Sequence, residues 1–154
     1  METPGAYAIP AGVGMLDFNN QGRDDMPYTD IVTALALLQF VWFGMQVAKA
    51  RGKYGVQAPA VTGNDIFERY FRVQQNTLEL LIALIPGLYL FGHYFSPLWA
   101  AGLGVIYLIG RQLYSMSYVK DPKSRSAGYA LSALPVVILL LAGLVGAVMR
   151  LAGH

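Results

Sequence analysis

The sequence predicts an all-α integral membrane protein built as an up-down bundle of four transmembrane helices. Of its 154 residues, 55% are apolar and only 13% are charged, against about 25% charged residues in an average soluble domain. Four long apolar segments follow one another, and each is near the roughly 20 residues that a membrane-spanning helix needs. Short polar connections separate these segments, so consecutive helices are expected to run antiparallel.

The first predicted helix covers about residues 29–50, and the second covers about residues 65–94. Asp30 lies in the first turn of the first helix, where an acidic side chain favours the helix start. Asn64 or Asp65 supplies a capping signal for the second helix.

The third predicted helix covers about residues 97–119, and the fourth covers about residues 124–151. The third is opened by the pair Ser-Pro and ends before Lys-Asp-Pro. In the fourth, Pro135 predicts a kink, and Gly143 and Gly146 permit close contact with another helix.

Residues 1–27 do not have the pattern of a signal peptide, which begins with a basic segment followed by an apolar run. Proline and glycine interrupt them. We expect an irregular leader outside the bilayer, followed by one membrane domain over residues 28–154.

Basic residues near the segment ends predict the orientation, because Lys and Arg favour the cytoplasmic side. They follow the first and third segments: Lys49, Arg51, Lys53, Lys120, Lys123 and Arg125. The connection between the second and third segments, GHYFSP, has neither Lys nor Arg. We expect both basic connections in the cytoplasm and both termini on the opposite side, in a bacterial inner membrane or the endoplasmic reticulum.

A stripe of polar side chains runs along the cytoplasmic half of the second predicted helix. At about 100° per residue, one face carries Glu68, Arg72, Gln75, Asn76 and Glu79. An ion facing lipid there would cost at least about 2.5 kcal/mol. The stripe must therefore face protein or a water-filled cavity. A buried hydrogen-bond network that binds no ligand would also account for these polar side chains.

The third predicted helix carries a second stripe of polar and aromatic side chains. Four of them fall within about 60° of one another: Tyr107, Arg111, Tyr114 and Tyr118. We interpret Tyr107 as part of an interfacial aromatic belt. The other three descend toward the cytoplasmic end.

The arginines expected at this end predict an anion-binding pocket. They are Arg51, Arg72, Arg111 and Arg125, with Glu79 as an opposing acid. Guanidinium groups bind carboxylates well, so the pocket suits a small polar molecule with carboxylates and an amine. The adjoining membrane interior suits a lipophilic molecule, and an enzyme that joins the two kinds of substrate needs both.

Several functional classes are not supported by the composition. The chain has no cysteine, so any thiol chemistry must use the thiol of a substrate. His93 and His154 lie far in sequence from the polar stripes, which argues against a metal site. The net charge of +2 is too small to indicate a nucleic-acid partner.

The segments FERYFRVQQNTLE and GVIYLIGRQLYSMSYVKDPKSR resemble the MAPEG family of membrane proteins in eicosanoid and glutathione metabolism. The resemblance is strongest to the branch that contains leukotriene C synthase and the small microsomal glutathione transferases. It covers the chain from about Gln46 to the end of the fourth segment. The motif E-R-x-x-R-x-Q-x-N-x-x-E is specific here because its spacing agrees with the four segments and with the later R-x-x-Y-x-x-x-Y pattern.

The resemblance implies a glutathione site and a homotrimer with glutathione bound between adjacent protomers. The residues that it assigns to glutathione are Arg51, Arg72, Gln74, Asn76, Glu79, Tyr114 and Tyr118; the pocket described above adds Arg111. Gln74 lies off the stripe, so it must reach another helix or a neighbouring subunit. Arg125 matches the arginine that stabilises the glutathione thiolate, and a guanidinium beside a sulfur does favour the anion.

The predicted function is that of a membrane-bound glutathione transferase acting on lipophilic electrophiles, with lipid hydroperoxides as further substrates. Leu80 and Gly52 depart from the leukotriene synthase branch, which argues against leukotriene synthesis itself. One alternative is a non-catalytic lipid-binding scaffold of the same family. Another is a small multidrug exporter, although the first helix lacks the acidic residue that such exporters need midway along it. Its amides, Gln39 and Gln46, are expected to make interhelical hydrogen bonds.

Overall fold

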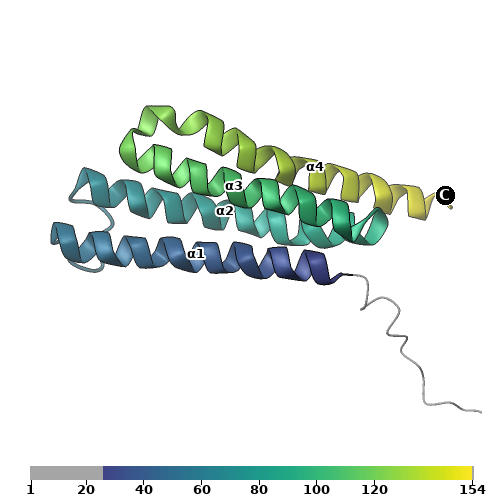
Figure 1. Ribbon diagram of the computed structural model, residues 1–154, viewed down its shortest axis with the longest axis horizontal. Helices are drawn as coiled ribbons and strands as arrows, with labels where there is room; N and C mark the ends of the chain where they lie inside the picture. Colours follow the sequence, from purple (N-terminus) through teal and green to yellow (C-terminus); the bar gives the residue numbers. More distant parts are fainter. Residues whose placement is uncertain (1–25, 154) are drawn as a thin grey trace, which may run out of the picture.

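The computed structural model describes residues 26–153, so nearly all of the predicted leader lies outside the described residues. Four long helices form the described chain (Figure 1): α1 (Pro27–Tyr54), α2 (Asp65–Tyr94), α3 (Pro97–Lys120) and α4 (Ser126–Leu151). A short 3-10 helix, η2 (Pro122–Arg125), precedes α4.

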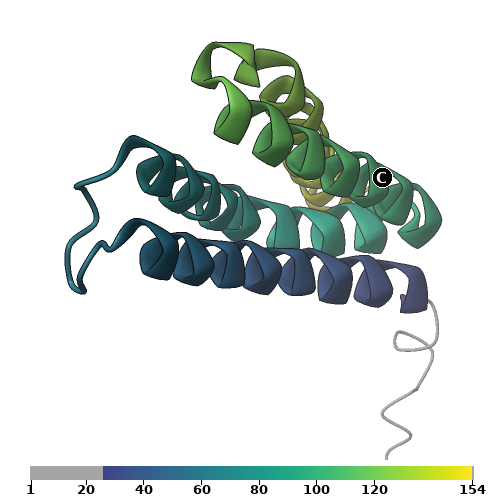
Figure 2. The same cartoon turned by 60° about the vertical axis from the view of Figure 1, so that its left-hand side comes forward.

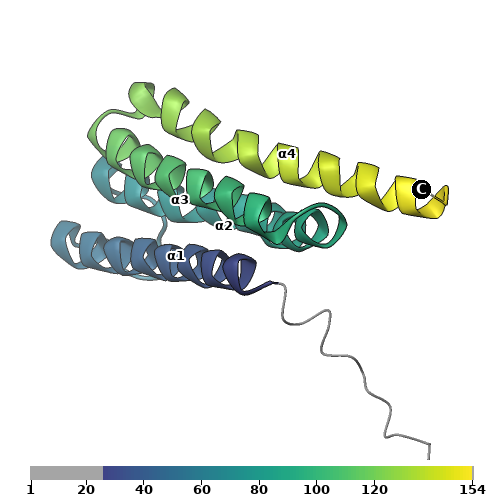
Figure 3. The same ribbon diagram turned by 45° about the vertical axis from the view of Figure 1, so that its right-hand side comes forward.

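Successive helices run antiparallel, as predicted. The α1–α2 and α3–α4 connections lie together at one end, which we call the basic end, and the α2–α3 turn lies at the other end (Figure 1). Figure 2 shows α1 and α2 side by side, with the α3–α4 pair inclined to them. The α2 and α3 helices lie between α1 and α4 (Figure 3). Most of the polar stripe on α2 lies at the surface, because Arg72, Gln75 and Glu79 are exposed.

Capping residues in the sequence explain where the helices begin and end. The Asn64 side chain accepts hydrogen bonds from the backbone N–H groups of Ile66, at 3.0 Å, and Phe67, at 3.1 Å, so it caps α2 as predicted. Gly55 ends α1 with a φ of 67°, a left-handed conformation that costs glycine little.

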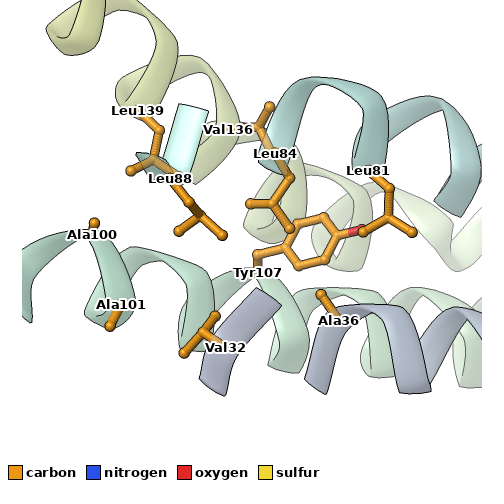
Figure 4. Packing of buried hydrophobic residues seen from close by; sticks show 10 residues of the cluster. All are labelled: Val32, Ala36, Leu81, Leu84, Leu88, Ala100, Ala101, Tyr107, Val136 and Leu139. Atoms are coloured by element: carbon orange, nitrogen blue, oxygen red, sulfur yellow. The ribbon is translucent and has the colours of Figure 1, made fainter. Parts of the chain in front are cut away.

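Apolar side chains from all four helices form the main core (Figure 4). Tyr107 lies inside it, near the middle of α3, with its ring beside Ala36, Leu81 and Leu84. Its exposed fraction is 0%, so the interpretation as an aromatic belt is wrong. Tyr107 does lie on the same face of α3 as Arg111, but this face points into the bundle rather than toward the membrane interface.

Two predicted interhelical contacts are present. The Gln39 amide donates to the Leu108 carbonyl of α3 at 3.0 Å. Glycines let α4 approach α2, because a Cβ on Gly143 would lie 2.8 Å from the Leu90 Cβ. A Cβ on Gly146 would lie 2.8 Å from the Tyr94 Cγ. Both glycines therefore act as predicted.

Within residues 26–153, three helical segments are long and apolar enough to cross a membrane: Pro27–Tyr54, Asp65–Tyr94 and Pro122–Leu151. The third predicted span, α3, is not among them. Its 24 residues give about 36 Å at 1.5 Å per residue, which exceeds a bilayer core of about 30 Å. Arg111 and Gln112 interrupt its apolar residues.

Candidate functional site

A pocket of about 570 Å³ opens at the basic end, between α2, α3 and the start of α4. We call it the arginine pocket. Among the described residues, two guanidinium groups and no carboxylate line it. The lining residues are Arg72, Asn76, Tyr114, Tyr118, Arg125, Ser126 and Tyr129. The pocket therefore favours an anionic ligand.

The helices place these side chains as pairs four residues apart, a spacing that puts both members on one helix face. Arg72 and Asn76 form the pair on α2. Tyr114 and Tyr118 form the pair on α3, and their rings stack with centroids 5.4 Å apart and planes inclined by 15°. Arg125 and Tyr129 form the third pair, across the junction of η2 and α4.

The turn between α3 and α4 fixes the position of Arg125. The Asp121 carboxylate accepts from the Lys123 backbone N–H at 3.0 Å, and the Ser124 hydroxyl donates to the Ser117 carbonyl at 3.1 Å. The Arg125 side chain is exposed, and its guanidinium carbon lies 5.6 Å from the centre of the Tyr118 ring. Its donors can therefore reach a ligand beside that ring.

Arg111 lies behind the pocket wall and does not line the pocket. Its exposed fraction is 0%. The guanidinium donates to the Asn76 side-chain oxygen at 3.0 Å and to the Thr77 hydroxyl at 2.6 Å. Its carbon lies 4.2 Å from the centre of the Tyr114 ring, so it contacts two pocket residues from inside the bundle.

Three other residues predicted for glutathione do not line the arginine pocket. Arg51 donates to the Ala60 carbonyl at 2.7 Å and thereby holds the α1–α2 connection. Gln74 faces α1, where a Cβ on Gly44 would lie 3.0 Å from its amide nitrogen. Glu79 is exposed on α2 and accepts from the Asn76 amide at 3.0 Å.

Two pocket residues, Ser126 and Tyr129, were not predicted from the sequence. The signal for Tyr129 was its position four residues after Arg125, which is one helical turn. Its ring centre lies 6.3 Å from that of Tyr114. Ser126 is the first residue of α4, and a helix N-terminus attracts negative charge.

The arrangement suits an anionic ligand that carries carboxylates. Two guanidinium groups bind carboxylates through charge-assisted hydrogen bonds, and the tyrosine and serine hydroxyls add further donors. In the described part of the chain, no group of three or more histidine, aspartate or glutamate side chains is placed to hold a metal ion.

The chain is similar to known membrane proteins of one family. The model of the MAPEG family matches residues 30–145. The chain is 43% identical to human microsomal glutathione S-transferase 2 over 75% of its own length and 78% of that protein. It is 32% identical to leukotriene C4 synthase of Cavia porcellus over 80% of its length and 83% of that protein. An uncharacterized protein of Synechocystis is 41% identical over 84% of this chain and 94% of its own length.

Proposed function

This chain belongs to the MAPEG family and is an integral membrane protein, and on that premise we propose that it is a glutathione transferase that conjugates lipophilic electrophiles. The observation that carries the proposal is the arginine pocket, which joins two guanidinium groups and three tyrosines at the basic end of an apolar bundle. Glutathione, with two carboxylates, an amine and a thiol, has the matching groups.

Arg125 is the proposed catalytic residue. A free thiol with a pKa of about 8.5 is only a few per cent thiolate at neutral pH. The exposed guanidinium and the beginning of α4 both favour the anion of a sulfur placed beside them. Each unit by which they lower the pKa of that thiol corresponds to about 1.4 kcal/mol.

The other lining side chains bind and orient glutathione. The Arg72 guanidinium takes a carboxylate, and the Asn76 amide and the Tyr114 hydroxyl take peptide or carboxylate groups. Tyr118, Ser126 and Tyr129 complete the wall. In this arrangement the sulfur points toward the junction of η2 and α4, where Arg125 lies.

The site is proposed to be complete only in a homotrimer, with glutathione between adjacent protomers. Arg72 and Glu79 are exposed on a helix that is otherwise apolar enough to cross a membrane. Charged groups facing lipid are costly, which supports a second copy covering this face. Arg51 and Gln74, which lie outside the pocket of their own chain, would then contribute to a neighbouring one.

The electrophile is proposed to enter from the bilayer. Next to Arg125 and Ser126, α4 presents an apolar surface made by Ala127, Ala130, Leu131, Ala133, Leu134 and Val137. The thiolate attacks an electrophilic carbon, a sulfur–carbon bond forms, and the leaving group departs with its electron pair. With a lipid hydroperoxide, the thiolate attacks an oxygen to give the lipid alcohol and a sulfenic acid. A second glutathione then reduces the sulfenic acid, giving the disulfide and water.

The basic end is proposed to face the cytoplasm, with both termini on the other side. The α1–α2 and α3–α4 connections carry the Lys and Arg residues that favour this orientation. Glutathione is a cytosolic thiol, so this topology gives the arginine pocket direct access to it.

The test is turnover by the purified protein in detergent with glutathione and a lipophilic activated aryl halide. We expect conjugation in the parent, and a loss of about tenfold to a hundredfold in kcat/KM for Arg125→Ala. Lys123→Ala is the matched control, because Lys123 lies in the same turn but does not line the pocket. Glutathione binding without turnover would favour the lipid-binding scaffold, and no binding would contradict the proposal.

A further inference from the structure

Arg111 is a cation in the interior of the bundle whose hydrogen-bond acceptors, among the described residues, are all neutral. They are the Asn76 side-chain oxygen, the Thr77 hydroxyl and the Val73 carbonyl, at 3.0, 2.6 and 3.3 Å. Within residues 26–153 its Nε has no hydrogen-bond partner. Burying a charge in this way is costly, and a well-packed apolar side chain is often at least as stabilising. Stability alone therefore does not account for an arginine here.

The contact with Asn76 fixes which end of that amide faces the arginine pocket. A guanidinium has donors only, so the Asn76 oxygen must point inward to Arg111. The Asn76 amide nitrogen then points the other way, where it donates to Glu79 Oε2 at 3.0 Å. The Glu79 carboxylate, which can only accept, favours the same orientation. Arg111 on the inside and Glu79 on the outside therefore hold the amide together, and Asn76 presents a donor.

The same guanidinium also supports the opposite wall of the pocket. Its carbon lies 4.2 Å from the centre of the Tyr114 ring, within the range of a cation–π contact. Tyr114 is 3% exposed and lines the arginine pocket. Arg111 thus fixes one pocket residue on α2 and one on α3 without meeting a ligand itself.

We propose that Arg111 is a positioning residue that sets the affinity for glutathione by holding the Asn76 amide with its nitrogen outward. The proposal rests on the proposed function and revises the expectation that Arg111 binds glutathione directly. Arg125, which is held separately by the α3–α4 turn, activates the thiol. Loss of the hydrogen bonds from the Arg111 guanidinium to Asn76 and Thr77 therefore weakens glutathione binding and leaves the chemical step unchanged.

The test is a double-mutant cycle in the full-length protein in detergent, with KM for glutathione, kcat and the titration of the bound thiol as readouts. Arg111→Lys keeps the charge but cannot reach Asn76 and Thr77 with one planar fork. We expect KM to rise by about tenfold, as for the loss of one charge-assisted hydrogen bond, with kcat and the thiol titration unchanged. In an Asn76→Ala background the same substitution should add little, because its effect acts through Asn76.

Two further variants separate positioning from folding. Thr77→Val removes one acceptor of Arg111 and no pocket residue, so it replaces Arg111→Lys in the cycle if the latter does not fold. Thr29→Val is the control, since it removes a partly buried hydrogen bond to the Pro97 carbonyl at the opposite end; it should leave KM unchanged. Additive effects with Asn76→Ala, or an unchanged KM, would overturn the proposal. A parent protein that binds no glutathione would overturn the proposed function as well.

Discussion

Gly128 is the position where one added methyl group should damage the arginine pocket. It lies in the first turns of α4, directly against the backbone of α3. A Cβ there would lie 2.6 Å from the Tyr114 Cα and 3.0 Å from the Leu113 carbonyl carbon, whereas ordinary contacts are 3.4–4 Å. Both neighbours are backbone atoms, so no side-chain rotation relieves the clash. In Gly128→Ala the two helices must separate by roughly 1 Å, which a close-packed interior resists.

The cost follows from two opposing effects. Overpacking of this kind destabilises a protein by about 1–3 kcal/mol, while alanine in a helix gains up to about 1 kcal/mol over glycine. Gly102→Ala on α3 is the matched control, because a Cβ at Gly102 would meet nothing within 4 Å and only the propensity gain remains. The control should therefore be more stable than Gly128→Ala by about 1–3 kcal/mol.

The assay is thermal unfolding of both variants in the same detergent, followed by glutathione binding. Gly128→Ala should unfold at a lower temperature and bind glutathione more weakly, because Tyr114 and Arg125 move apart. If both variants unfold at the same temperature and bind glutathione equally well, the tight α3–α4 contact does not support the pocket and the reasoning fails.

The structure makes three further predictions. Tyr107→Phe should leave the unfolding temperature unchanged or raise it, because the buried hydroxyl has no hydrogen-bond partner among the described residues; a clear drop would reveal an unrecognised partner. Asn64→Ala should destabilise by about 1 kcal/mol through the lost α2 cap, and Asn64→Asp should restore it; equal unfolding temperatures for the two would contradict the capping role. Arg69→Ala should weaken glutathione binding modestly while preserving kcat, because Arg69 donates to the Val119 carbonyl at 3.0 Å and steadies the end of α3; a loss of kcat alone would contradict this.

The helices could be predicted because their signals are local in the sequence. Asn64 and the pair Ser96-Pro97 mark helix starts through contacts within a few residues. Paired spacing likewise predicted that Arg72 and Asn76 share a face, and both line the pocket. Helical angle and capping depend only on neighbours along the chain, so no tertiary information was needed.

The burial of a side chain and the partners of its contacts could not be predicted in the same way. The angle of Tyr107 placed it on the face of Arg111 but did not reveal that this face points into the bundle. For Arg111, the sequence indicated a charge near the pocket, whereas its acceptors come from a different helix. In the sequence, Tyr129 resembles an ordinary interfacial tyrosine. Only the packing of α4 against α3 brings its ring beside that of Tyr114.

The measurement that tests the central claim most directly is the ultraviolet absorbance of the glutathione thiolate, titrated with pH, in the parent protein and in Arg125→Ala. A cation beside the sulfur stabilises the anion, so the pKa of bound thiol in the parent should lie at least about one unit below 8.5. Arg125→Ala should return it toward that value, and Lys123→Ala should not. If Arg125→Ala binds glutathione and titrates like the parent, Arg125 does not activate the thiol and the proposed mechanism is wrong.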